Sequence, residues 1–277
     1  MKLATIRLDD HRTAAVRADG DHLVELGQPD VGAVLAAPGG LAAAARANGP
    51  RHPRAGADLA PVVPHPGKVV CVGLNYRNHI QEMGRDLPQH PTLFAKFADT
   101  LIGAGDDIRR PVETEQFDWE AELALVIGKE VRRADEDEAV AAIAGFTVLN
   151  DITCRDWQFR TREWLQGKNW DSSTPVGPFL VTADETGARP ALDIRCEVDG
   201  RLMQSDNTGD LLFDPVELVR YVSTTLRLRP GDIIATGTPG GVGHARKPAV
   251  FLQGGETVVT EIQGLGRLEN RVVREDV

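Results

Sequence analysis

Cysteine is scarce in this 277-residue chain, and the few cysteines present lie far apart. Cys71, Cys154 and Cys196 are odd in number and widely spaced. They match neither the disulfide framework of a small secreted protein nor the paired clusters of a structural zinc site. This usage fits a reducing compartment, so we expect a cytoplasmic protein.

Positive charge and long apolar runs are also scarce. The chain has 31 Lys+Arg against 41 Asp+Glu, and no block of it is rich in basic residues. A nucleic-acid-binding protein needs such a block to neutralise phosphates, so this class is excluded. Charges interrupt the first ten positions before a signal-peptide core can form, and no apolar run approaches the length of a membrane span. We expect neither nucleic acid nor membrane as a partner.

Turn-forming residues, by contrast, are abundant. The 28 glycines and 17 prolines favour many short strands over a helical bundle, so we predict an α+β fold that is mainly β. A proline-punctuated stretch cannot continue a helix or a central strand, and its prolines lie at positions 50, 53, 61, 64 and 66. It predicts a small N-terminal α+β domain with its linker at 1–64 and a larger domain at 65–277.

The N-terminal domain carries no chemical signature. Its pattern predicts two short strands, at 3–8 and 22–26, and an alanine-rich helix at 38–47. We draw no function from it.

Helix-start signals are clear at two places in the larger domain. Asp135 with Glu138 has the spacing of a capping box, and we expect that helix to be terminated by Gly145. Asp214 with Glu217 repeats the same spacing. Between and around these helices we predict a loop at 171–178, a hairpin turn at 199–200, and strands at 68–73, 92–97, 146–149, 190–198, 232–236, 256–262 and 267–273.

The stretch 117–128 places two carboxylates inside an apolar run. If it is a strand, Glu120 and Glu122 point to the same side, about 7 Å apart, while Ala121, Leu123 and Leu125 point to the other side. Two unpaired carboxylates on a half-buried face are costly, and a hard divalent cation such as Mg²⁺ or Mn²⁺ would remove that cost. On a helix the two glutamates would instead lie about 200° apart, as solvated charges.

Asp151 is the candidate third ligand. It follows the predicted strand at 146–149. The chain therefore runs from the strand of Glu122 through a helix and a second strand to Asp151. This order would return Asp151 to the two glutamates as a third oxygen ligand.

His79 and Glu82 form a candidate proton-transfer pair. Their spacing of three residues brings both side chains to one face of a helical turn, so the carboxylate could orient the imidazole as a general base. The alternative is a surface ion pair of small energetic value.

Further along the chain, Arg155 and Lys168 are cations that would hold an anionic substrate beside a carboxylate-held metal, although each alone could be a surface charge. The glycine-rich stretch 237–243 lacks the Gly-Lys-Ser/Thr of a nucleotide-binding loop. We expect its backbone to approach a small ligand closely.

Taken together, these motifs resemble the fumarylacetoacetate hydrolase family, in particular its short bacterial acylpyruvases and 2-hydroxyhepta-2,4-diene-1,7-dioate isomerases. The resemblance spans about residues 66–275 and rests on ordered blocks: Gly73-x-Asn75-Tyr76 with His79 and Glu82, Phe94-x-Lys96, Asp118-Trp119-Glu120-x-Glu122, Asn150-Asp151, Lys168 with Pro175-x-Gly177-Pro178, and Thr236-Gly237-Thr238-Pro239. Trp119 and Gly255 depart from the residues common in the family.

The resemblance implies a mixed β-roll or sandwich catalytic domain, usually in a homodimer. It implies Mg²⁺ or Mn²⁺ held by Glu120, Glu122 and Asp151, and a lid that carries His79 and Glu82. It also implies a catalytic role for Lys168 and substrate contacts from Tyr76, Arg155, Gln158 and Thr238.

The chemistry that follows is hydrolysis of a C–C bond in a 3-acylpyruvate, a 2,4-diketo acid. Glu82 would orient His79 to activate water, and Lys168 would stabilise the leaving enolate, beneath a lid hinged at Gly84 and Pro88. Tryptophans 157, 164 and 170 are candidates for the distal pocket.

Two alternatives stay open. The same site could decarboxylate or isomerise oxaloacetate or a hydroxylated dienoic diacid. A third possibility is a keto-acid-binding protein without turnover.

Overall fold

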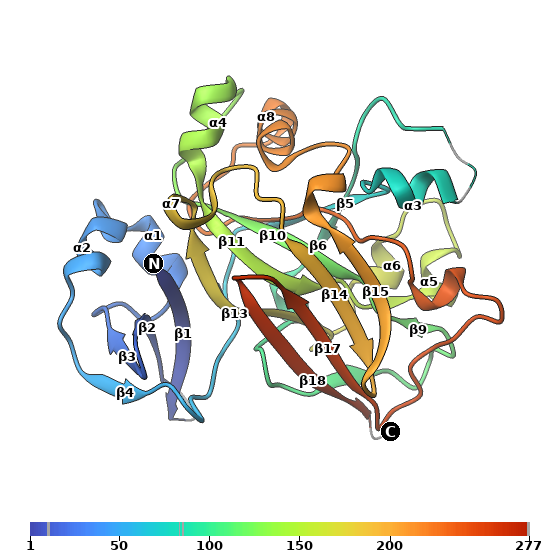
Figure 1. Ribbon diagram of the computed structural model, residues 1–277, viewed down its shortest axis with the longest axis horizontal. Helices are drawn as coiled ribbons and strands as arrows, with labels where there is room; N and C mark the ends of the chain where they lie inside the picture. Colours follow the sequence, from blue (N-terminus) through green and yellow to red (C-terminus); the bar gives the residue numbers. More distant parts are fainter. Residues whose placement is uncertain (10–11, 83, 85, 276–277) are drawn as a thin grey trace.

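Two β-sheets form the body of the protein (Figure 1), in a computed structural model that describes residues 1–9, 12–82, 84 and 86–275. The larger sheet has the order β4-β3-β2-β1-β13-β11-β10-β16-β5-β6, with β7 paired to β13. Its strands are β1 (Lys2–Asp9), β2 (Arg12–Asp19), β3 (His22–Glu25), β4 (Arg51–Pro53), β5 (Val69–Gly73), β6 (Thr92–Lys96), β7 (Leu101–Ile102), β10 (Ala121–Ile127), β11 (Ile143–Asn150), β13 (Thr174–Thr182) and β16 (Ile233–Ala235).

The smaller sheet has the order β15-β14-β17-β18-β8, and a two-stranded ribbon joins β9 to β12. These strands are β8 (Ile108–Arg110), β9 (Phe117–Asp118), β12 (Thr153–Cys154), β14 (Asp193–Val198), β15 (Arg201–Asn207), β17 (Thr257–Ile262) and β18 (Gly266–Arg274). The helices are α1 (Val31–Ala36), α2 (Gly40–Arg46), α3 (Arg77–Glu82), α4 (Glu136–Ala142), α5 (Arg155–Gln158), α6 (Leu165–Lys168), α7 (Ala183–Thr186) and α8 (Pro215–Thr225), with short 3₁₀ turns at Ala98–Thr100, Thr208–Asp210 and Gly243–Ala245.

Strand β10 lies at the centre of the core and is buried along its whole length. Leu123 and Leu125 share a hydrophobic cluster with Val258 of the smaller sheet, whereas Ala124 and Val126 share a second cluster with Val31 of α1. The alternation of side chains along a strand therefore supplies both layers of the core. The mainly β, α+β fold predicted from the sequence is confirmed.

The N-terminal strands continue the larger sheet. Strand β1 pairs antiparallel with β13, with Lys2 opposite Val181 and Leu3 opposite Leu180. In Figure 1 the N-terminal elements form the blue group at the left, beside β13. The strands predicted at 3–8 and 22–26 are present as β1 and β3, and the predicted helix corresponds to α2; β2 and α1 were not predicted.

The loop predicted at 171–178 is wrong, because residues 174–182 form the buried strand β13. The turn-forming residues Pro175 and Gly177 lie in this strand because Pro175 pairs with Ile102 of β7 and Gly177 pairs with Val148 of β11. The predicted role of Gly145 as a helix terminator is also wrong. Helix α4 ends at Ala142, and Gly145 lies in β11, where an added Cβ would be 2.1 Å from the carbonyl oxygen of Val181.

The other local signals are confirmed. Asp135 and Asp214 both form complete capping boxes, with Glu138 and Glu217 respectively. Asp199 and Gly200 have φ values of 49° and 72°, which suit the tight turn between β14 and β15. Among the described residues, no helix is both long and apolar enough to cross a membrane.

Candidate active site

Strand pairing brings three carboxylates together. Ala121 of β10 lies opposite Asn150 of β11, and one residue further the Asp151 amide donates to the Glu120 carbonyl oxygen at 2.8 Å. Glu120 and Glu122 point to the same side, so the sheet register places all three carboxylates in one cluster. One ligand oxygen from each of Glu120, Glu122 and Asp151 lies within 4.8 Å of the others.

This carboxylate triad is buried, with exposed fractions of 7%, 1% and 0% for Glu120, Glu122 and Asp151. Glu122 accepts a hydrogen bond from the Gly237 amide at 2.8 Å. Burial, together with the charges of Asp151 and Glu120, raises the pKa of Glu122 well above its usual value. The ionised form is therefore least favourable at Glu122, and a bound cation would stabilise it most there.

Two buried lysines compensate the other carboxylates. Lys168 Nζ lies 2.7 Å from Glu120 Oε2 and 2.6 Å from Asp151 Oδ2, and Lys96 Nζ lies 2.8 Å from Asp151 Oδ1. Burial alone would lower the pKa of Lys168, but Asp151 and Glu120 outweigh it and raise the pKa to about 12. Burial would likewise raise the pKa of Asp151, but the charges of Lys168 and Lys96 lower it. Lys168 is therefore a permanent cation, and Asp151 is ionised.

Arg155, at the start of α5, is held by two acids and one amide. Its Nε donates to Asp118 Oδ2 at 2.8 Å, and its Nη1 lies 2.6 Å from Glu120 Oε1 and donates to Gln158 Oε1 at 3.0 Å. Nη2 is buried and has no hydrogen-bond partner among the described residues. A buried guanidinium N–H without a partner is costly, so this nitrogen is available for an anionic ligand.

Gln158 and Thr238 have complementary capacities. The Gln158 carbonyl oxygen already accepts from Arg155, which leaves its NH₂ group as a donor. The Thr238 hydroxyl donates to the Ala121 carbonyl oxygen at 2.9 Å and accepts from Gln204 Nε2 at 2.8 Å. The hydroxyl oxygen has one acceptor position left, so it can accept a hydrogen bond from a ligand but cannot donate one.

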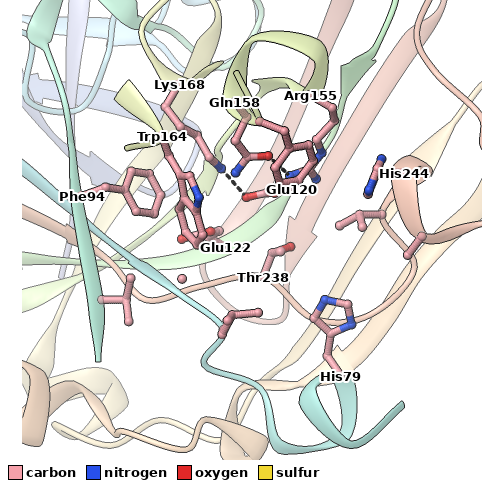
Figure 2. A pocket seen from close by; sticks show the side chains of 16 residues that line it. His79, Phe94, Glu120, Glu122, Arg155, Gln158, Trp164, Lys168, Thr238 and His244 are labelled. Atoms are coloured by element: carbon pink, nitrogen blue, oxygen red, sulfur yellow. Dashed lines mark hydrogen bonds and ion pairs between the residues drawn. The ribbon is translucent and has the colours of Figure 1, made fainter. Parts of the chain in front are cut away.

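These side chains line one cavity of about 200 Å³. Its polar lining consists of the two triad glutamates, two imidazoles and four further side chains: Glu120, Glu122, His79, His244, and then Arg155, Gln158, Lys168 and Thr238. Figure 2 shows Lys168 on one side of the view and the two imidazoles on the other, with Glu120 and Thr238 between them.

Helix α3 brings His79 to this cavity. After β5 the chain turns at Leu74, whose φ is 57°, and Asn75 anchors the turn by donating to the carbonyl oxygens of Phe213 and Thr236. His79 is 8% exposed and lines the cavity. The side chain of Glu82 lies outside the part of the chain that the structure describes, so the predicted His79–Glu82 pair stays a prediction.

An aromatic wall closes the cavity beside Lys168. The rings of Phe94 and Trp164 meet edge to face with centroids 5.4 Å apart, and Lys168 Nζ lies 4.9 Å from the Phe94 centroid. Gly73 makes room for this wall, since a Cβ there would lie 2.4 Å from Trp164 Cζ3.

Most of the predicted site residues therefore meet in one place, but three do not. Tyr76 is fully buried in the hydrophobic core and is not part of the cavity lining, so this geometry gives no support to its predicted substrate contact. Trp157 and Trp170 pack against each other, with ring centroids 5.1 Å apart, and they also do not line the cavity. Of the three tryptophans considered for the distal pocket, Trp164 alone lines the cavity.

Lys96, Asp118 and His244 contribute to the site without a predicted role. Lys96 follows two apolar positions of an alternating strand, Asp118 precedes the two glutamates, and His244 follows the glycine-rich stretch. Their ion-pair and hydrogen-bond partners lie in distant segments of the chain. No local spacing therefore identified them.

Comparison with known proteins gives consistent results. The sequence model of the fumarylacetoacetate (FAA) hydrolase C-terminal family matches residues 68–273. A mitochondrial oxaloacetate tautomerase of Bos taurus is 48% identical over 217 residues, which cover 78% of this chain and 69% of the relative.

Among solved structures, the fumarylacetoacetate hydrolase of the psychrophilic Exiguobacterium antarcticum is 32% identical, with a TM-score of 0.88 and coverage of 99% and 100% of the two chains. The fumarylpyruvate hydrolase of Pseudomonas aeruginosa, in complex with Mn²⁺ and pyruvate, is 35% identical, with a TM-score of 0.69 and coverage of 75% of this chain and 90% of that one.

Proposed function

Because this chain belongs to the fumarylacetoacetate hydrolase family, we propose that it is a divalent-metal-dependent enzyme that interconverts the enol and keto forms of oxaloacetate or a closely related 2-oxo dicarboxylic acid. The observation that carries the proposal is the buried carboxylate triad, whose two glutamates line the cavity, next to a buried guanidinium nitrogen that has no hydrogen-bond partner among the described residues. The similarity to a relative named for oxaloacetate tautomerisation supports this choice over hydrolysis.

The residues present fit a hard divalent cation. All three carboxylates offer oxygen, the ligand type that Mg²⁺ and Mn²⁺ prefer, and their ligand atoms are within 4.8 Å of one another. Within the described part of the chain, Glu122 forms no ion pair with a cationic side chain, unlike Glu120 and Asp151. Glu120, Glu122 and Asp151 would therefore hold Mg²⁺ or Mn²⁺. When bound, the ion supplies a Lewis acid for the 2-oxo acid group.

The surrounding side chains bind and orient the substrate. Arg155 Nη2 and the Gln158 NH₂ group are donors for a carboxylate, and both lie in the cavity lining. Thr238 can accept the enol O–H, because its own proton is committed to Ala121. These groups would hold the planar enol in one orientation against the Trp164 side of the cavity.

In the enol-to-keto direction, carbon 3 gains a proton and the enol oxygen loses one. In the keto-to-enol direction, carbon 3 loses a proton and the oxygen gains one. Lys168 is fixed as a cation by Asp151 and Glu120, so it would stabilise the negative charge that grows on the oxygen. His79, on helix α3, lines the cavity and would exchange the proton at carbon 3.

The test follows both the enol and the product. Purified protein with Mg²⁺ or Mn²⁺ is mixed with oxaloacetate, enol loss is followed by ultraviolet absorbance, and malate and lactate dehydrogenases report keto-oxaloacetate and pyruvate. We expect faster enol loss with keto-oxaloacetate as the product, and loss of this effect after chelation. Accelerated pyruvate formation instead would indicate a decarboxylase and would contradict the tautomerase assignment.

Hydrolysis of an acylpyruvate is the second candidate function. It is favoured by the position of His79 on the cavity wall and by the similarity to a fumarylpyruvate hydrolase. Acetylpyruvate and fumarylpyruvate should then be cleaved to pyruvate and a second acid. Replacing His79 with alanine should abolish this cleavage, since His79 is the group proposed to activate water, whereas decarboxylation should persist in part.

Two broader expectations are tested alongside. A non-catalytic binding protein would show tight binding of oxalate by calorimetry without any product in these assays. The homodimer that the family resemblance suggests would be checked by light scattering of the purified chain at assay concentrations. A cytoplasmic location, expected from the cysteine usage, stays a prediction beside a relative that is mitochondrial.

A further inference from the structure

His244 is an imidazole of the cavity lining to which the proposed reaction assigns no role. It lies in the short turn Gly243–Ala245 that follows the glycine-rich stretch, and its side chain is exposed at the cavity mouth. Its ring centroid lies 5.2 Å from that of Phe159, which fixes one side of the imidazole. Figure 2 places it on the Arg155 side of the cavity, away from Phe94 and Trp164.

A single buried carboxylate ties His244 to Arg155. Asp118 is fully buried, and its Oδ2 accepts from both Arg155 Nε at 2.8 Å and the His244 amide at 3.0 Å. Its Oδ1 accepts from the Gly243 amide at 2.7 Å. A Cβ on Gly243 would lie 1.9 Å from the Val250 carbonyl oxygen, so the turn cannot shift easily. Asp118 therefore fixes the backbone of His244 relative to the Arg155 guanidinium.

The pair offers an anion hydrogen-bond donors, although Arg155 already forms ion pairs with Asp118 and Glu120. The carboxylates of the cavity lining are Glu120 and Glu122 of the triad, and Asp118 is already engaged by four donors. Burial and then the positive charge of Arg155 lower the pKa of His244. The imidazole is thus an N–H donor on the same side of the cavity as a guanidinium whose Nη2 has no hydrogen-bond partner among the described residues.

We propose that His244 and Arg155 form a distal subsite that binds the second carboxylate of a 2-oxo dicarboxylic acid. This inference rests on the proposed function, because it requires the 2-oxo acid end of the substrate to occupy the triad side of the cavity. The distal subsite then makes the enzyme selective for diacids over mono-acids of the same length. His244 supplies the hydrogen bond, Arg155 supplies the charge, and Asp118 is a positioning residue for both.

A matched substrate pair isolates the distal charge. Oxaloacetate and its 4-ethyl ester share the reacting carbons, but the ester lacks the second negative charge. The variant His244→Phe keeps a ring against Phe159 and loses the N–H donor. We expect it to raise KM for oxaloacetate about fivefold, equivalent to about 1 kcal/mol, with little change in kcat or in either constant for the ester. His244→Gln retains a donor and should fall between the two.

A binding experiment decides the inference independently of turnover. Calorimetry in the presence of Mg²⁺ compares malate with 2-hydroxybutanoate, which has a methyl group in place of the distal carboxylate. We expect the wild type to prefer malate and His244→Phe to lose most of that preference. His22→Ala, which removes an exposed imidazole on β3, should leave the preference unchanged.

Equal changes for oxaloacetate and its ester, or no loss of malate preference in His244→Phe, would overturn the distal subsite. Absence of any malate preference in the wild type would also overturn it. If the wild type converts neither substrate yet prefers malate through His244, the proposed function fails and the subsite stands.

Discussion

Lys96 allows the carboxylate triad to be tested through stability instead of activity. It is 1% exposed, its Nζ lies 2.8 Å from Asp151 Oδ1, and it is not part of the cavity lining. Lys96→Met keeps much of the side-chain volume but removes the charge. Asp151 is then left in the core with Lys168 as its remaining cationic partner.

The expected cost follows from this burial. Removing one partner of a buried ion pair typically destabilises a protein by about 3–5 kcal/mol, and we expect about 3 kcal/mol because Lys168 still compensates Asp151. The triad also becomes more negative, so Mg²⁺ should bind about tenfold more tightly than in the wild type. By linkage, saturating Mg²⁺ should then restore about 1.4 kcal/mol more stability to the variant than it adds to the wild type.

Urea denaturation with and without Mg²⁺ measures both quantities. The matched control is Lys68→Met, which breaks the ion pair of Lys68 with the buried Asp232. Asp232 directly precedes β16, whereas Gly237, whose amide donates to Glu122, follows the end of that strand. The control therefore removes a lysine–aspartate ion pair outside the triad. Its cost should be smaller, since Lys68 is 26% exposed, and Mg²⁺ should add no more to it than to the wild type. Equal Mg²⁺ increments in all three proteins would refute the assignment of Asp151 as a metal ligand.

Three further substitutions test separate parts of the structure. Glu122→Gln should abolish Mg²⁺ binding by calorimetry and reduce activity at least about a hundredfold; full activity after chelation and Mg²⁺ add-back would contradict the triad. Gly73→Ala should displace the Trp164 ring and lower kcat/KM about tenfold, whereas Gly105→Ala, where an added Cβ meets nothing within 4 Å, should leave activity unchanged. Asp214→Ala removes the capping box of α8 and should cost about 1 kcal/mol in urea denaturation; a cost below a few tenths would show that the cap contributes little.

Local sequence patterns predicted those parts of the site that lie on one strand or at its end. The alternation of Glu120 and Glu122 follows from the strand period, and Asp151 follows because antiparallel neighbours return to the same edge. Both capping boxes were also predictable, because the donors and acceptors of a helix start lie within four residues of each other.

The remaining parts depend on contacts between distant segments. Residues 174–178 contain the turn-forming Pro175 and Gly177, yet pairing with β7 and β11 holds them in a strand. The Lys96–Asp151 pair joins two strands that are not neighbours in the sheet. The role of Asp118 needs donors from α5 and from the turn at 243–245 at once. None of these arrangements has a characteristic spacing in the sequence.

The pairing of β1 with β13 has a consequence for any attempt to shorten the protein. Without residues 1–64, β13 would lose β1 and present unpaired backbone N–H and C=O groups beside Leu180 and Val181. An exposed apolar strand edge of this kind recruits other chains. The N-terminal strands therefore also act as a protective cover for the sheet, and an isolated 65–277 fragment should aggregate unless another strand replaces β1.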